Sequence, residues 1–131
     1  MDFDTGQPIY RQIIDDFKKK LVRGELQAGD KIPSQREYAE NYRVNPNTVQ
    51  RAYREMESMN IVETVRGQGT FIRIDQENLT RIRGDMATQV LEYYVNEMKA
   101  LGYEGKEIIE LVSNHMSKEE VYINDTVSGS K

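Results

Sequence analysis

The stretch that most constrains this chain runs from Ser34 to Glu57, SQREYAENYRVNPNTVQRAYREME, and predicts two short helices joined by a tight turn. Ser34 followed three residues later by Glu37 is a capping box, in which each side chain pairs with a backbone N–H that the first helical turn leaves unpaired. Asn45 followed by Pro46 predicts the second start, because asparagine is a strong N-cap and proline at the first helical position has no N–H to leave unpaired. Two capped helices separated by so few residues indicate a helix-turn-helix.

The second helix divides into two faces when its residues are placed at about 3.6 per turn. One face is apolar and consists of Val49, Ala52, Tyr53 and Met56. The other face carries amide and guanidinium groups on Asn47, Gln50, Arg51 and Arg54. Such groups pair bidentately with adenine or guanine edges in the major groove, and arginine also neutralises phosphates. A solvated helix face is the alternative interpretation, and this pattern taken alone favours it.

A length of 131 residues allows one ordinary domain, or one compact domain with a helical extension. With 37% hydrophobic and 31% charged residues, the composition is typical of a globular protein, and no apolar run approaches the roughly 20 residues of a membrane span. The first ten residues, MDFDTGQPIY, are acidic and lack the apolar segment of a signal peptide. We therefore expect a cytoplasmic protein with no membrane partner.

Few residues here are suited to catalysis or metal binding. The chain has no cysteine, and His115 is its only histidine, so a structural zinc site would lack its usual ligands. A Ser-His pair would have to use His115, whose place on an apolar helical stripe favours a packing or surface role. We therefore expect no enzyme, no metal and no cofactor, and a small hydrolase is disfavoured.

Charge is distributed unevenly around the net value of −4. Residues 1–74 contain 12 basic and 11 acidic residues, whereas residues 75–131 contain 6 basic and 11 acidic residues. The acidity therefore belongs to the C-terminal part, and the N-terminal part can supply the local basic patch that a DNA-binding surface requires.

Before the helix-turn-helix, a helix is predicted from Ile9 to near Gly24, with an apolar stripe at helical spacing that comprises Tyr10, Ile13, Ile14, Phe17 and Leu21. Phe3, in the irregular lead-in, is a candidate apolar strap. A short extended piece is predicted at Lys31–Ile32, because the residue before a proline avoids the helical region. Within the helix-turn-helix we expect three residues of its first helix to face inward, Tyr38, Ala39 and Tyr42.

After Asn60 the sequence changes to strand patterns. Ile61–Val65 and Thr70–Ile74 are β-branched runs, joined by Arg66-Gly67-Gln68-Gly69, and predict a hairpin. A hairpin directly after a recognition helix is a wing, although an ordinary hairpin that completes the core would show the same strands. The tip favours the wing, because Gly67 allows close approach of the backbone and its neighbours carry donors suited to a minor groove or a phosphate.

Three motifs in this order, PIYRQI, GDKIPSQREYAENYRVNPNTVQRAYREME and VRGQGTFI, resemble the GntR family of bacterial transcription regulators over about residues 7–74. The short length and the helical tail are similar to the YtrA subfamily. The resemblance implies a winged helix-turn-helix domain in a nucleoid-associated protein that binds a palindromic double-stranded DNA operator as a dimer. It also implies that the protein usually represses transcription in response to a small molecule.

The resemblance also assigns roles to residues. Arg36 stands where the family has a first-helix arginine that reaches the major groove, and Thr48 stands at a DNA contact of the recognition helix. The chain departs from the family at two positions: a better-known branch has arginines where this chain has Pro46 and Gln50. Asn45 and Asn47 would therefore carry more of the readout. The full set of candidate DNA-binding residues is Ser34, Arg36, Arg43, Asn45, Asn47, Thr48, Gln50, Arg51, Arg66, Gly67 and Gln68.

Arg43 lies in the turn, where glycine is common in the family. A left-handed conformation there would cost arginine about 1 kcal/mol. A phosphate contact would explain why arginine is present.

Residues 75–131 predict two helices after a polar link at Asp75–Asn78. The first, of about 23 residues, ends at Gly102 and carries an apolar stripe of Leu79, Ile82, Met86, Val90, Tyr94, Met98 and Leu101. The second, shorter helix begins near Gly105 and carries Ile108, Leu111, Val112 and His115, with Met116 at its end. Beyond Ser117 the periodicity is lost, and we expect a frayed end.

Two antiparallel helices cannot cover both of their own apolar faces, so the tail predicts a dimer with an identical chain. The stripes of both helices, from Leu79 to Val112, are the candidate dimerisation residues. A small ligand cavity lined by Tyr93, Tyr94 and Tyr103 is an alternative use of the tail, although aromatic packing is the simpler interpretation. The predicted fold is mainly α with a small β-hairpin: an N-terminal winged helix-turn-helix (residues 1–74) and a C-terminal two-helix dimerisation extension (residues 75–131). A winged-helix module that binds proteins rather than an operator is the alternative function.

Overall fold

A computed structural model of the chain describes residues 6–129, with side chains described for residues 6–120. Phe3, the expected strap, lies outside the described residues. The chain forms two compact units that divide between Asp85 and Met86. Its elements, in order, are α1 (Ile9–Val22), β1 (Lys31–Ile32), α2 (Gln35–Tyr42), α3 (Pro46–Ser58), β2 (Val62–Val65), β3 (Gly69–Ile72), α4 (Gln76–Ala100) and α5 (Gly105–Gly129).

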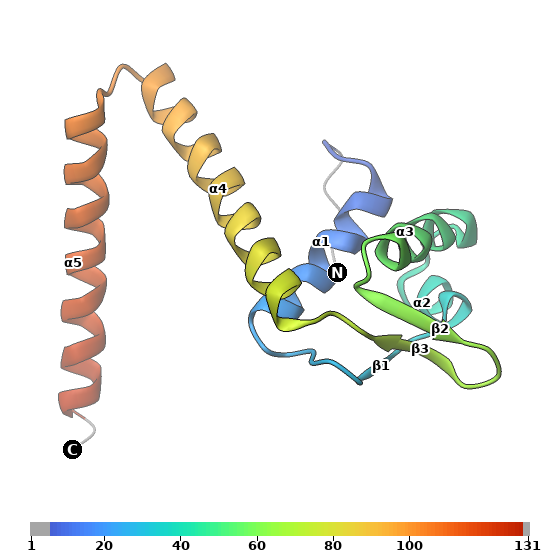
Figure 1. Cartoon of the computed structure of the whole chain (residues 1–131). Coiled ribbons are helices and arrows are strands. Elements are labelled where there is room, and N and C mark those ends of the chain that lie inside the picture. The colour runs from blue at the N-terminus through green and yellow to red at the C-terminus, as the bar shows by residue number, and fades with distance from the viewer. Residues whose placement is uncertain (1–5, 130–131) are drawn as a thin grey trace. The chain divides into compact units, whose positions relative to one another are not determined.

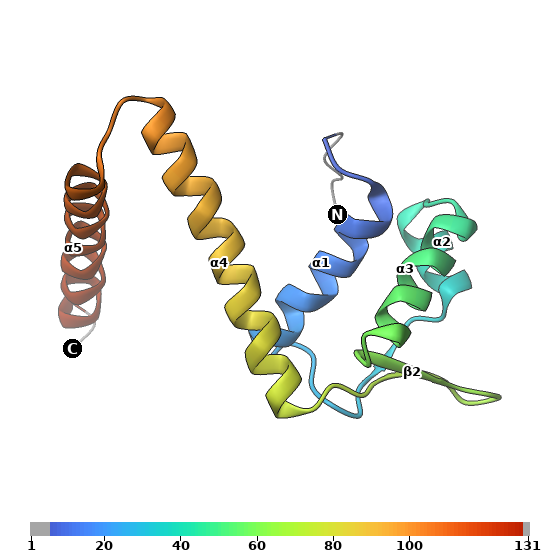
Figure 2. The ribbon, with the colours of Figure 1, turned by 45° about the horizontal axis from the view of Figure 1, so that its top comes forward.

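The first unit is a winged helix-turn-helix, which confirms the predicted fold class (Figures 1 and 2). Its antiparallel sheet has the strand order β1-β3-β2. The hairpin pairs Val62 with Ile72 and, at its other end, Val65 with Gly69. The extended piece at Lys31–Ile32 joins this sheet as a third strand on β3. In both views the β2–β3 loop extends beyond α1, α2 and α3.

The core lies where α1 and α3 cross. An aromatic cluster fills it, in which the Phe17 ring centroid lies 5.8 Å from that of Tyr38 and 6.0 Å from that of Tyr53. Burial of each such side chain stabilises the fold by about 1.5–3 kcal/mol. The Tyr53 hydroxyl donates a hydrogen bond to the Pro33 carbonyl oxygen at 2.6 Å, and this bond connects α3 to the segment before α2. Tyr42, expected to face inward, is 37% exposed, although its ring packs on Tyr38 at 4.4 Å.

Both predicted helix starts are confirmed. The Glu37 N–H donates to Ser34 Oγ at 3.0 Å and the Ser34 N–H donates to Glu37 Oε1 at 3.4 Å, which completes the capping box. The Asn47 N–H donates to Asn45 Oδ1 at 2.8 Å, and Pro46 occupies the first turn of α3. Because these caps use only local atoms, they are among the features that sequence specifies best.

The tail departs from its prediction at two places. Asp75–Asn78 is not a polar link, because α4 begins at Gln76 and the Asn78 N–H donates to Asp75 Oδ1 at 2.8 Å. The second helix is not short, because α5 continues beyond Met116 to Gly129. No glycine or proline interrupts residues 106–128, and Lys118-Glu119-Glu120 are strong helix formers. Among the described residues, no helix is both long enough and apolar enough to cross a membrane.

Candidate nucleic-acid interface

A groove of about 580 Å³ lies between α2 and α3 on the surface of the helix-turn-helix. It is lined by Gln35, Arg36, Ala39, Glu40, Val44, Pro46, Asn47 and Gln50. Three of the predicted DNA-binding side chains therefore meet in one groove, Arg36 from α2 and Asn47 and Gln50 from α3. Together these amide and guanidinium groups offer hydrogen-bond donors and acceptors, the kinds of group that pair with purine edges in the major groove.

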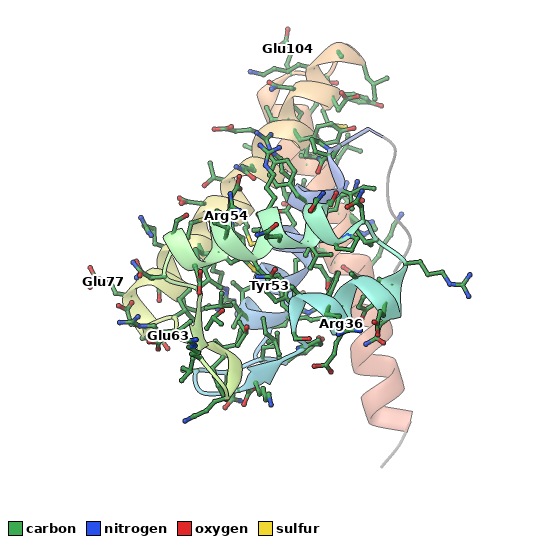
Figure 3. The ribbon with its side chains drawn as sticks, turned by 90° about the vertical axis from the view of Figure 1, so that its right-hand side faces the viewer. Arg36, Tyr53, Arg54, Glu63, Glu77 and Glu104 are labelled. Atoms are coloured by element: carbon green, nitrogen blue, oxygen red, sulfur yellow. The ribbon has the colours of Figure 1, made fainter. Side chains whose placement is uncertain are left out.

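Arg36 is the most exposed charged group of this groove, with 89% of its side chain exposed. Its Nε lies 3.3 Å from Oε1 of Glu40, one helical turn further along α2. An exposed pair of this kind contributes only about 0.3–0.5 kcal/mol, so Arg36 can leave it readily for a nucleic-acid acceptor. Figure 3 shows Arg36 on α2 and Arg54 on α3, whereas Tyr53 lies on the inner side of α3.

Arg51 lies on a different flank of α3 from the groove. Its Cζ is 3.8 Å from the centroid of the Tyr10 ring of α1, and its Nε is 3.6 Å from Oε1 of Glu55. The sequence placed Arg51 on one outer face with Asn47 and Gln50, but the structure separates it toward α1. Tyr10, predicted only as part of an apolar stripe, is therefore a neighbour of a candidate DNA-binding residue.

Two of the predicted residues also hold the helix starts. The side-chain oxygens of Ser34 and Asn45 accept backbone N–H groups, so each has a structural role at the edge of the groove. Arg43 adopts a left-handed conformation, with φ 53° and ψ 49°, and its N–H donates to the Ala39 carbonyl. Thr48, in the first turn of α3, is half-buried.

The predicted wing tip is exposed at Arg66, Gly67 and Gln68. Gly67 has φ 80°, and no atom lies within 4 Å of the position that a Cβ would take. The Gln68 N–H donates to the Val65 carbonyl at 2.9 Å and closes the turn. The sequence did not predict that Lys31 lies at the wing. Its Cε lies 2.7 Å from the position that a Cβ would take if Gly69 carried one. Only the pairing of β1 with β3, which is remote in sequence, brings this lysine close to Gly69 at the start of β3.

The strongest pKa shifts belong to core tyrosines and not to the groove. Burial is the main cause that raises the pKa of both Tyr38 and Tyr53 above the ordinary phenol value. Neither residue is placed for proton transfer to a bound molecule, because both rings pack in the aromatic core. Among the described residues, no group of histidine and carboxylate side chains can hold a metal ion.

The predicted dimerisation residues differ in exposure. Ile82 and Ile108 are buried within the chain, and Leu79, Met86, Tyr94 and Met98 are half-buried. Val90 and Leu101 are 69% and 73% exposed, and Leu111 and Val112 are also exposed. Of the tyrosines proposed to line a cavity, Tyr93 and Tyr103 are exposed and Tyr94 is half-buried. Four predicted dimerisation residues of the second unit are thus exposed to solvent, Val90, Leu101, Leu111 and Val112.

Comparisons with known proteins match both the motifs and the fold. Residues 9–72 match the sequence family described as "Bacterial regulatory proteins, gntR family". The chain is 49% identical over 108 residues to the uncharacterized HTH-type transcriptional regulator YhcF of Bacillus subtilis (strain 168), across 82% of this chain and 89% of that protein. It is 39% identical over 111 residues to the HTH-type transcriptional repressor YtrA of the same bacterium, across 85% and 84%. Among solved structures, a GntR family transcriptional regulator from Listeria monocytogenes is similar with a TM-score of 0.76 and 40% identity, across 86% of this chain and 98% of that one.

Proposed function

The chain belongs to the GntR family of bacterial transcription regulators, and from this premise we propose that it represses transcription as a homodimer bound to a palindromic double-stranded DNA operator. It is a DNA-binding transcriptional regulator, and its relatives are regulators and not enzymes. Repression is supported by its similarity to a protein named as a repressor. The site of action would be the nucleoid in the cytoplasm.

The groove between α2 and α3 is the observation that carries the proposal. Arg36, Asn47 and Gln50 converge there from two helices, and each type of side chain pairs bidentately with a purine edge. We assign Arg36 to a guanine, and the two amide side chains to adenines. Arg66 and Gln68 would meet the adjacent minor groove or a phosphate, with Gly67 allowing the backbone to approach closely.

The palindrome follows from the dimer. The exposed apolar residues of α4 and α5 support pairing with a second copy, because a surface of this kind is rarely left in water. The α3 helices of the two copies would then bind two half-sites about 34 Å apart, one turn of DNA. Release by a small-molecule effector completes the proposal, with Tyr93, Tyr94 and Tyr103 as candidates to line its site.

Selection of bound duplexes from a random DNA pool tests this function. We expect an enriched palindrome, and Arg36→Ala should weaken its binding by about 1–3 kcal/mol while random DNA is much less affected. Arg23→Ala is the matched control, since Arg23 is also exposed and paired with a carboxylate, that of Glu25 at 3.1 Å, but does not line the groove. Equal losses on both DNAs would make Arg36 a phosphate contact. No enrichment by the wild-type protein would favour a protein-interaction module.

A further inference from the structure

The start of α1 carries a cluster that the groove does not use. Two guanidinium groups lie at the Tyr10 ring, with Arg51 Cζ 3.8 Å and Arg11 Cζ 5.9 Å from its centroid. Arg11 Nε also donates a hydrogen bond to the Tyr10 hydroxyl at 3.1 Å. Tyr10 and Arg11 belong to the PIYRQI motif, none of whose residues lines the groove between α2 and α3.

The contacts of Arg51 determine where its charge is held. Arginine stacks on aromatic faces, and the negative face of the ring attracts its cation. Glu55 holds the same guanidinium through Nε at 3.6 Å, while 60% of the Arg51 side chain remains exposed. Contacts with α1 and with the next turn of α3 therefore restrict a side chain that would otherwise be mobile.

The flank on which Arg51 lies is suited to a phosphate. Gln50 lies on the α2 side of α3, in the groove, whereas Arg51 lies on the α1 side. A helix that reads bases through its centre meets the sugar–phosphate backbone at its flanks, where contacts fix register without reading sequence. Arginine is well suited to phosphate oxygens because its donors lie in one plane and its charge does not titrate.

We propose that Arg51 binds a backbone phosphate of the operator, and that Tyr10 is a positioning residue that holds its guanidinium for this contact. The inference rests on the proposed DNA-binding function and adds to it a site outside the groove. A purely structural role for the Tyr10 contact, in which it only packs α1 on α3, makes a different prediction. Loss of packing lowers thermal stability, whereas loss of a phosphate contact lowers the salt dependence of binding.

The experiment measures affinity for the selected operator duplex and for a random duplex of equal length over a range of salt concentrations. We expect Tyr10→Leu and Arg51→Ala each to weaken binding to both duplexes about tenfold. The logarithm of the association constant falls with the logarithm of the salt concentration, and each variant should make this slope less steep by about 0.9, the effect of one lost phosphate contact. Tyr10→Phe, which keeps the ring, should retain the wild-type slope.

The double variant Tyr10→Leu/Arg51→Ala isolates the coupling. We expect it to bind within about twofold of Arg51→Ala alone, because both changes remove the same contact. Tyr42→Ala is the control for loss of a partly exposed ring, and should change thermal stability but not the slope. A wild-type slope in Tyr10→Leu, a wild-type slope in Arg51→Ala, or multiplied losses in the double variant would each overturn the proposal. Failure of the wild-type protein to prefer the operator would instead overturn the proposed function.

Discussion

Arg43 ends α2 in a left-handed conformation that favours glycine. Its Cβ makes this conformation cost about 1 kcal/mol or more. We therefore expect Arg43→Gly to raise the free energy of unfolding by about 1 kcal/mol, measured by urea denaturation. Arg43→Ala keeps the Cβ and should bring no such gain. If Arg43 contacts a phosphate, both variants will lose affinity for random duplex DNA, and equal binding by wild type and variants would remove it from the interface.

Tyr53 makes the stability of the fold depend on pH. Burial raises the pKa of its phenol, so the folded state holds the proton more tightly than the unfolded state does. This contribution is fully present below the unfolded pKa of about 10 and is lost as the pH rises through the raised folded pKa.

The variant Tyr53→Phe separates the two roles of the hydroxyl. At pH 7 it should lower the free energy of unfolding by about 1 kcal/mol, because the hydrogen bond to Pro33 is lost. Above about pH 10 its stability should decline less steeply than that of the wild type. Urea unfolding at both pH values measures this, with Tyr93→Phe, at a 69% exposed tyrosine, as the control. Parallel pH profiles of wild type and Tyr53→Phe would contradict the assignment.

At the scale of elements, Asn45 at the start of α3 has an observed capping role and a predicted recognition role. Asn45 was predicted to share in base readout, yet its Oδ1 accepts the Asn47 N–H. Asn45→Ala should therefore cost about 1 kcal/mol of folding stability, whereas Asn45→Ser keeps a cap and should stay within about 0.5 kcal/mol of wild type. Thermal unfolding tests the cap. Operator affinity of the stable Asn45→Ser variant then tests readout by the amide, because only that group is missing.

Local rules predicted what local atoms decide. The capping box at Ser34, the cap at Asn45 and the hairpin after Asn60 all follow from residues within a few positions of one another. Contacts between residues remote in sequence could not be predicted in this way. The pairing of β1 with β3 and the contact of Arg51 with the Tyr10 ring are two examples. A helical period places a residue on a face but does not say which neighbour will cover it.

At the scale of the whole molecule, residues 1–74 and residues 75–131 differ in net charge. The basic and acidic residues nearly balance over residues 1–74, and the excess of acidic groups falls in residues 75–131. Acidic groups in the tail disfavour its adhesion to DNA phosphates, so we expect the DNA contacts to come from residues 1–74. The apolar surface that α5 exposes is then available for a second copy.

The dimer is testable through Leu111 and Val112, two exposed apolar residues of α5. Light scattering at micromolar concentration should give the wild type twice the 15.2 kDa mass of one chain. Leu111→Asp/Val112→Asp places two charges in the proposed interface and should give a monomer, because an unpaired buried charge is strongly disfavoured. The control Ser113→Asp/Asn114→Asp adds the same charge to polar positions of the same helix and should remain dimeric.

DNA binding should follow the oligomeric state. A dimer engages two half-sites at once, and loss of the second engagement typically lowers affinity by about 10²–10⁴-fold. The monomeric variant should therefore bind the full palindrome no better than a single half-site, while its first unit keeps its fold by circular dichroism. A wild-type monomer in solution, or a monomeric variant with full operator affinity, would show that recognition does not require a second copy.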